Sequence, residues 1–137
     1  MTDEKINAVV TALQSFWSQF GIPAFQEGTV PDEMPDGKGG LKPVTMPYIT
    51  YRVIIPDWSQ PASTFARVWY RSTSYNGIYS KVSEISEVIG RGTSIKVKDF
   101  GLIWLFKDTN FFQYMPDETG DGNIKIAYLS LIEHVFM

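Results

Sequence analysis

The chain has 137 residues, a length typical of one domain with a single hydrophobic core, and its 15% aromatic content excludes a disordered protein. A net charge of −3 without any run of Lys or Arg argues against a nonspecific nucleic-acid binder, which would carry a basic patch. The absence of cysteine excludes disulfides, thiolate catalysis and cysteine-held zinc. Since the sequence also lacks an apolar run of the roughly 18 residues that span a membrane and begins unlike a secretory signal, we expect one cytoplasmic domain over residues 1–137, with no membrane partner.

Residues 2–20 predict an amphipathic helix, because their large apolar side chains recur at the spacing of one helical face. Thr2 can serve as the N-cap, and Gly21 with Pro23 beyond it supplies the stop. A short strand is expected over residues 23–27. The apolar stripe of the helix consists of Ile6, Val9, Val10, Leu13, Phe16, Trp17 and Phe20.

The next segment, residues 28–45, holds so many Gly, Pro and Asp residues that the pattern predicts a long flexible loop without regular structure. Loops of this length in a compact domain are usually functional or disordered. The sequence Gly-Lys-Gly-Gly at 37–40 is not a phosphate-binding loop, because no Ser or Thr follows the lysine. We expect Pro31, Asp32 and Lys38 in this loop to contact a partner.

Residues 48–55 predict the principal strand of a sheet. The segment is rich in β-branched and aromatic residues, and Pro47 and Pro56 bound it at the two ends. Its odd positions form an apolar face that we expect to lie under helices, and its even positions form a mixed face that includes Arg52. That mixed face is a candidate surface for a neighbouring subunit.

A second strand is predicted over residues 64–72, antiparallel to the first, with Arg67, Trp69 and Arg71 on one face. Two interpretations of that face stay open. It is either a contact patch or a solvated face on which arginine stems cover an indole ring.

The second half of the chain predicts another helix, a hairpin and a long last strand. The helix follows Ser74 as its N-cap and ends at Gly90 or Gly92. Strands over 94–98 and 102–107 form an outer and an inner hairpin strand around a turn at 99–101, and residues 111–115 form a short extended aromatic segment. The last strand, 124–136, is central because both of its faces are largely apolar. The apolar stripe of this helix consists of Ile78, Tyr79, Val82, Ile85, Val88 and Ile89.

An acidic turn at 116–123 precedes the last strand and carries Asp117, Glu118 and Asp121 as candidate contact residues. It begins like a calcium-binding loop, but Tyr128 stands where such a loop needs a bidentate glutamate, so no dedicated calcium site is expected. Taken together, the elements predict an α+β fold in which two helices pack on a mostly antiparallel or mixed sheet.

A search for catalytic motifs is negative. His134, the one histidine, lies near the end of the last strand, a place that favours a sheet end or a subunit contact over a catalytic triad. The sequence contains no nucleophile elbow, no zinc-protease helix and no dinucleotide fingerprint. We therefore expect no enzyme, no cofactor and no metal.

The order of these elements resembles the tail terminator proteins of long-tailed bacteriophages, also called minor tail or tail-component proteins, in the form found in phages and prophages of Gram-positive bacteria. The resemblance covers nearly the whole chain and depends on short motifs. They are the opening helix running into Phe20-Gly21-Ile22-Pro23-Ala24-Phe25, then Thr29-Val30-Pro31-Asp32, Met46-Pro47-Tyr48-Ile49-Thr50-Tyr51, Val68-Trp69-Tyr70-Arg71-Ser72-Thr73-Ser74, and Asp117-Glu118 before the final strand.

The resemblance implies a structural protein of the virion, made in the host cytoplasm, with helices packed on a sheet. Such proteins form a hexameric ring that caps the tail tube, ends polymerisation of the major tail protein and forms the tail side of the head–tail joint. It implies as partners other copies of the chain, the major tail protein and a head-completion or neck protein, with DNA only passing through the lumen.

Two alternatives stay open. One is a head-completion or neck adaptor, which is also a small α+β ring subunit. The other belongs to a different class: a cytoplasmic ligand-binding or enzymatic domain with an aromatic pocket built from Trp58, Trp69 and Trp104.

Overall fold

A computed structural model describes residues 2–56, 60–115 and 120–137 of the chain. These residues combine helices and strands, which confirms the predicted α+β fold. The elements in chain order are α1 (Asp3–Trp17), the short 3-10 helix η1 (Ser18–Phe20), β1 (Ala24–Gln26), β2 (Glu33–Pro35), β3 (Leu41–Pro43), β4 (Tyr48–Tyr51), β5 (Ala62–Arg71), α2 (Asn76–Ile89), β6 (Thr93–Val97), β7 (Gly101–Met115) and β8 (Ile124–Phe136).

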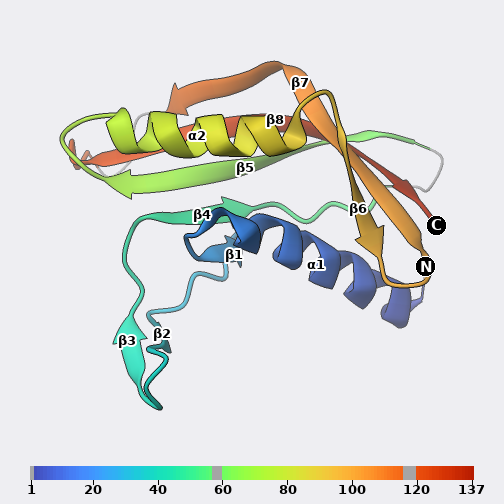
Figure 1. Cartoon of the computed structure of the whole chain (residues 1–137), viewed down its shortest axis with the longest axis horizontal. Helices are drawn as coiled ribbons and strands as arrows, with labels where there is room; N and C mark the ends of the chain where they lie inside the picture. The colour runs from blue at the N-terminus through green and yellow to red at the C-terminus, as the bar shows by residue number, and fades with distance from the viewer. Residues whose placement is uncertain (1, 57–59, 116–119) are drawn as a thin grey trace.

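Six strands form one mixed sheet in the order β1-β4-β5-β8-β7-β6 (Figure 1). The pair β1 and β4 is parallel, and the other neighbours are antiparallel. The last strand lies between β5 and β7, as its two apolar faces predicted. The buried sides of α1 and α2 join alternate residues of these strands in one hydrophobic core, so both helices cover the same face of the sheet.

The helix predicted over residues 2–20 is present as α1 followed directly by the 3-10 helix η1, and its cap and stop are the predicted ones. The Thr2 hydroxyl accepts a hydrogen bond from the Lys5 N–H at 3.3 Å, and Gly21 ends the following 3-10 turn with a left-handed φ of 78°. Ile6, predicted on the buried stripe, is 37% exposed, and Ala12 is buried instead. The helix contacts both edge strands of the sheet, β1 and β6. It therefore lies across the gap between the two edges of a curled sheet.

Helix α2 is shorter at its N-terminus than predicted. Its N-cap position is Tyr75, which makes no capping bond, and the Ser72 hydroxyl instead accepts from the Ser74 N–H at 3.1 Å in a local turn. Tyr79 and Val88 were expected on the buried stripe but are 51% and 40% exposed. The helix thus buries a narrower face than predicted, and it ends before Gly90 as expected.

The prediction of a principal strand over residues 48–55 is wrong in the length of the strand and in its place in the sheet. Strand β4 ends at Tyr51, and the long neighbours β5 and β8 lie nearer the middle of the sheet. One more ladder bond, from the Arg52 N–H to the Phe65 carbonyl at 3.0 Å, follows the strand. The Thr64 hydroxyl then donates to the Arg52 carbonyl at 3.2 Å, so a side chain takes the place of the next ladder partner.

The prediction of an irregular loop over residues 28–45 is also wrong, because strands β2 and β3 form an antiparallel hairpin inside it. This hairpin projects away from the rest of the molecule (Figure 1). The Asp36 carboxylate accepts hydrogen bonds from the N–H groups of Lys38 at 2.7 Å and Gly40 at 3.1 Å. Gly37 and Gly39 provide the positive φ angles of the turn. The Gly and Asp residues therefore form one tight turn.

The hairpin of β6 and β7 is confirmed, with β6 as the outer strand and a turn at residues 98–100. Strand β7 is longer than expected, because it includes the aromatic segment 111–115. Its pairing with β8 shifts register between Lys107 and Phe112, the position of a bulge or irregularity. A bulge adds unpaired residues without ending a strand. The alternation of apolar and polar residues is broken there, so the sequence pattern alone does not show that the strand continues.

Candidate functional site: interaction surfaces

Four of the predicted contact residues gather on the face of the sheet opposite the helices. Arg67, Trp69 and Arg71 alternate along β5 with buried residues that point to the core, and Arg52 follows β4 beside them. Tyr128 of β8 lies directly opposite Arg67. We call this surface the arginine–aromatic face; it consists of Arg52, Phe65, Arg67, Trp69, Arg71 and Tyr128.

Phe65 contacts three other residues of this face. Its ring stacks on Tyr128 with centroids 5.0 Å apart. The guanidinium groups of Arg52 and Arg67 lie 5.5 Å and 5.0 Å from the Phe65 centroid, and Arg67 also lies 3.7 Å from a carboxylate oxygen of Glu27. Cation–π contacts of this kind hold the charged groups in place while leaving donors free. The face therefore presents two ordered arginines.

Trp69 continues the face towards the edge of the sheet. Its indole N–H donates to the Thr50 hydroxyl at 2.9 Å, and its ring lies 6.0 Å from that of Tyr48. Phe25 of β1 packs edge-on against Tyr48, also at 6.0 Å. Burial raises the pKa of the Tyr48 hydroxyl. The aromatic row thus reaches the edge strand β1.

Arg71 extends the face towards the predicted acidic turn. Its guanidinium donates to the Asp121 carboxylate at 2.9 Å. A hydrogen bond from the Asn123 N–H and the contact with Arg71 lower the pKa of Asp121. Two other predicted contact residues of the turn, Asp117 and Glu118, lie outside the described residues.

The remaining predicted contact residues, Pro31, Asp32 and Lys38, are exposed on the projecting hairpin segment, apart from the arginine–aromatic face. Register places Pro35 opposite Leu41, and Leu41 is 65% exposed. Because the side chains of directly opposed residues share one face of a hairpin, Glu33, Pro35 and Leu41 point the same way. We call these three residues the outward hairpin face.

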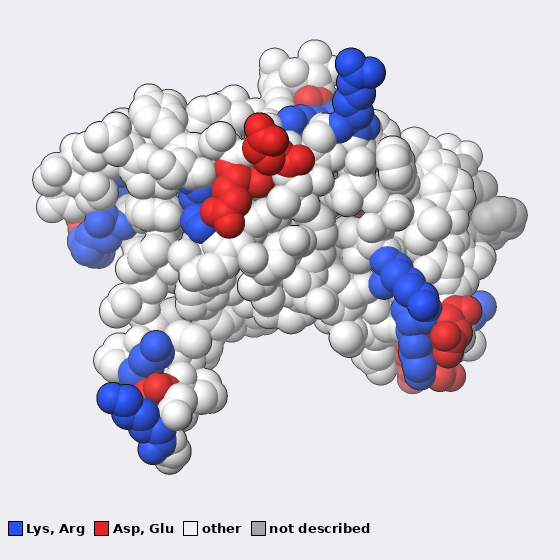
Figure 2. Space-filling model, viewed as in Figure 1, with Lys and Arg blue, Asp and Glu red and all other residues white. Residues whose placement is uncertain are grey.

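The opposite side of the hairpin turns towards the body. Met34 and Lys42 are paired there and line a hollow with Ile22 and Pro47. In Figure 2 the hairpin carries its own small group of charges, separated by uncharged surface from the others on that side. Met34 and Lys42 therefore form the anchored side of the hairpin; on the other side Pro43 also lines the hollow, whereas Leu41 stays exposed.

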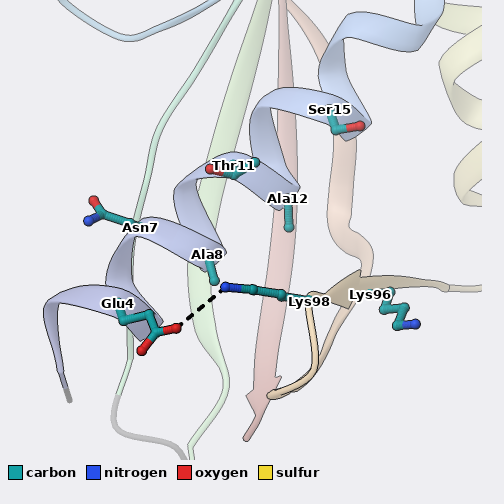
Figure 3. Close-up of a pocket in the computed structure, with 8 residues that line it drawn as sticks. All are labelled: Glu4, Asn7, Ala8, Thr11, Ala12, Ser15, Lys96 and Lys98. Carbon is teal, nitrogen blue, oxygen red and sulfur yellow. Dashed lines mark hydrogen bonds and ion pairs between the residues drawn. The ribbon is translucent and has the colours of Figure 1, made fainter.

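A groove runs between α1 and β6 at the other end of the body, with a volume of about 700 Å³. Figure 3 shows Lys98 reaching across it to Glu4, at 3.4 Å, while Lys96 points away from the helix. Small residues line its helical wall, and a neighbouring hollow shares three of its lining residues, so the groove continues along the helix. The residues of the helical wall are Glu4, Asn7, Ala8, Thr11, Ala12 and Ser15. Sequence reasoning missed this groove, because no single residue in it is unusual.

Sequence reasoning also missed Glu133, which is 1% exposed on the core side of β8, between Ala62 and Leu105 of the flanking strands. Its carboxylate oxygens accept no hydrogen bond of normal geometry, although the Ile54 N–H faces them. Burial raises the pKa of Glu133 to about 7, and that N–H offsets only part of the effect. The signal was present in the sequence as a carboxylate inside an otherwise apolar strand.

The aromatic pocket of the ligand-binding alternative is not assembled by its described members. Trp69 pairs with Ile126 and Trp104 with His134, so their backbone partners lie eight residues apart along β8, roughly 27 Å at 3.4 Å per residue. Trp58 lies outside the described residues. Within the described ranges, no group of three or more His, Asp or Glu side chains is placed to hold a metal ion, and neither helix is long and apolar enough to cross a membrane.

No protein-family model matches the chain, and no curated protein sequence matches it.

Proposed function

We propose that this protein is a structural subunit of a bacteriophage tail, a terminator that assembles into a ring on the tail tube. The ring ends polymerisation of the major tail protein and forms the tail side of the head–tail joint. In this proposal the partners are other copies of the chain, the major tail protein and a head-completion protein, and DNA only passes through the lumen. The protein acts in the virion and is made in the host cytoplasm.

The observation that carries the proposal is the pair of ordered arginines on Phe65. Arg, Tyr and Trp are enriched at the energetic centres of protein interfaces, where aromatic residues provide contact area and arginines provide fixed donors. Here Arg52 and Arg67 are held over aromatic rings on the face opposite the helices. A subunit with one face in its own core and one such face outward is suited to packing beside another subunit.

A second feature supports a ring over an isolated pair. The projecting hairpin and the arginine–aromatic face are different surfaces of one chain. Contacts between unlike surfaces are heterologous, and heterologous contacts close into rings when the rotation between subunits permits it. The terminator family named by the sequence motifs works as such a ring.

The experiment is inactivation of the gene in a phage that encodes the protein, followed by electron microscopy of tails and heads. The proposal predicts tails of abnormal length, because nothing stops the major tail protein. Tails of normal length beside unjoined heads would overturn it in favour of the neck adaptor. Normal infectious particles would overturn both.

A further inference from the structure

We propose that the outward hairpin face of one copy occupies the α1–β6 groove of the next copy in the ring. This inference deepens the proposed function, on which it rests, by naming one pair of surfaces that join neighbouring subunits, in addition to the contact assigned to the arginine–aromatic face. Its partner is a second copy of this chain.

The groove has the properties of a site for an extended segment. Strand β6 is an edge strand, and on its outer side no described strand pairs with it. Four of the six α1 residues that line the groove, Ala8, Thr11, Ala12 and Ser15, have short side chains that allow close approach; the other two are Glu4 and Asn7.

The hairpin has the properties of the occupant. Leu41 is the most exposed large apolar side chain described, at 65%, and Pro35 beside it is also exposed. The Asp36 carboxylate fixes the turn by accepting two N–H groups, so docking need order little further backbone. An apolar projection that is already folded is suited to a shallow groove lined by small residues.

The prolines determine how the hairpin can dock. The bonds Asp36 N–H to Gly40 carbonyl and Val44 N–H to Asp32 carbonyl show that even-numbered residues face the partner strand. The backbone nitrogens of Pro35 and Pro43 therefore lie on the outer edges of the hairpin. Proline has no N–H there to bond with a further strand. The hairpin contacts the groove chiefly through the side chains of its outward face.

The charges of the two surfaces are complementary. Glu33, exposed on the outward hairpin face, makes no ion pair with any described residue. Lys96 at the rim of the groove is equally without a carboxylate partner among the described residues, whereas Lys98 is already paired with Glu4. Docking would bring Glu33 to Lys96.

The positions of the two surfaces favour a ring. Figure 1 shows the hairpin projecting at one end of the body and strand β6 at the other end, and the residues that line the groove come from β6, its following turn and α1. One chain therefore cannot fill its own groove, but each copy can fill the groove of the next. Contacts of this head-to-tail kind either close into a ring or continue as a filament.

Cross-linking tests the contact, because the chain contains no cysteine of its own. Leu41→Cys protein is mixed with Thr11→Cys protein and treated with a short bis-maleimide, in solution and on tail tubes. The matched controls are Lys42→Cys, on the anchored side of the hairpin, and Ser83→Cys, on the exposed side of α2. We expect covalent dimers from the Leu41→Cys and Thr11→Cys mixture and their loss with either control.

Charge reversal provides the second readout. Glu33→Lys and Lys96→Glu should each weaken self-association by roughly two- to fivefold, and the double variant should restore it. Lys42→Glu should leave self-association unchanged. Rescue by the double variant cannot arise from misfolding of either single variant.

The outcomes separate this inference from the proposed function. Rings that form without the predicted cross-link would overturn the inference alone. A cross-link from Thr11→Cys only to the major tail protein would also overturn it, since the occupant would be another protein. Failure to form any oligomer, in solution or on tails, would overturn both.

Discussion

The two faces of the six-stranded sheet are formed by the same strands but have different surroundings: one packs against the helices and the other faces outward. On the side of the helices, Ala66, Val68 and Leu129 are each fully buried. On the opposite side, Arg67 and Tyr128 alternate with these residues along the same strands and stay half-exposed. The guanidinium of Arg67 lies over the ring of Tyr128. A strand with period two can therefore carry a core on one side and a prepared contact surface on the other. We therefore expect substitutions on the helix side of the sheet to affect folding and substitutions on the opposite side to affect association.

The largest expected effect is that of Leu129→Ala on the core side. Truncating a buried leucine removes its packing and leaves a cavity, so we expect the free energy of unfolding to fall by roughly 2–5 kcal/mol. The neighbouring Ser130→Ala, on the other face, is the matched control and should change it by less than about 0.5 kcal/mol. Urea titration of both variants measures the difference. Equal losses would mean that the two faces are not distinct.

Glu133→Gln tests the one charged group on the core side. The folded protein holds the pKa of Glu133 at about 7, against an ordinary value of 4.5, so the folded state binds the proton more tightly than the unfolded state. The wild type should therefore lose stability as pH rises from 4.5 to 7, by about 3 kcal/mol in total. Glutamine carries no charge at any pH.

We accordingly expect the variant to become more stable than the wild type as pH rises through that window and to remain more stable at pH 8. Urea titrations of both proteins at pH 4.5, 6 and 8 measure it. The pKa values of Asp36 and Asp121 are lowered, so their protonation in acid destabilises both proteins equally. The difference between the two proteins therefore isolates Glu133. A constant difference between the curves would show that Glu133 does not titrate in this range.

Trp69→Phe tests how firmly the arginine–aromatic face is built. It deletes the N–H that donates to the hydroxyl of Thr50, which is 4% exposed. Because a buried hydroxyl loses its partner, we expect a loss of about 1 kcal/mol in unfolding free energy. Thr50→Val in the same background should cost much less than it does alone, and a double-mutant cycle measures that coupling. Independent effects would mean that the bond contributes nothing.

The sequence predicted the parts of the fold that depend on periodicity. The stripe of α1, the alternation of β5 and the continuous apolar character of β8 each follow from local spacing, and each element is present as expected. The length of β4 could not be predicted, because just after its end the Thr64 hydroxyl donates a hydrogen bond to the Arg52 carbonyl. These two residues are twelve positions apart in the chain. Composition alone also does not separate a loop from a hairpin with three-residue strands.

The candidate surfaces were predictable only in part. Residue types identified Arg67 and Trp69, and strand register was needed to place Tyr128 and Phe65 beside them. The α1–β6 groove joins segments about eighty residues apart in the chain, and its side chains are ordinary ones. Its existence depends on the curl of the sheet, which leaves no mark on any single position.

The most direct test of the account is Arg52→Glu, whose effect on folding should be the smallest of the series and whose effect on assembly should be the largest. Arg52 is exposed, so its unfolding free energy should stay within about 0.5 kcal/mol of the wild type. Sedimentation of both proteins over a range of concentrations gives the result. We expect a ring of defined mass for the wild type and a folded, smaller species for the variant. Identical particle masses for the two folded proteins, or an unfolded variant, would contradict the role assigned to the arginine–aromatic face.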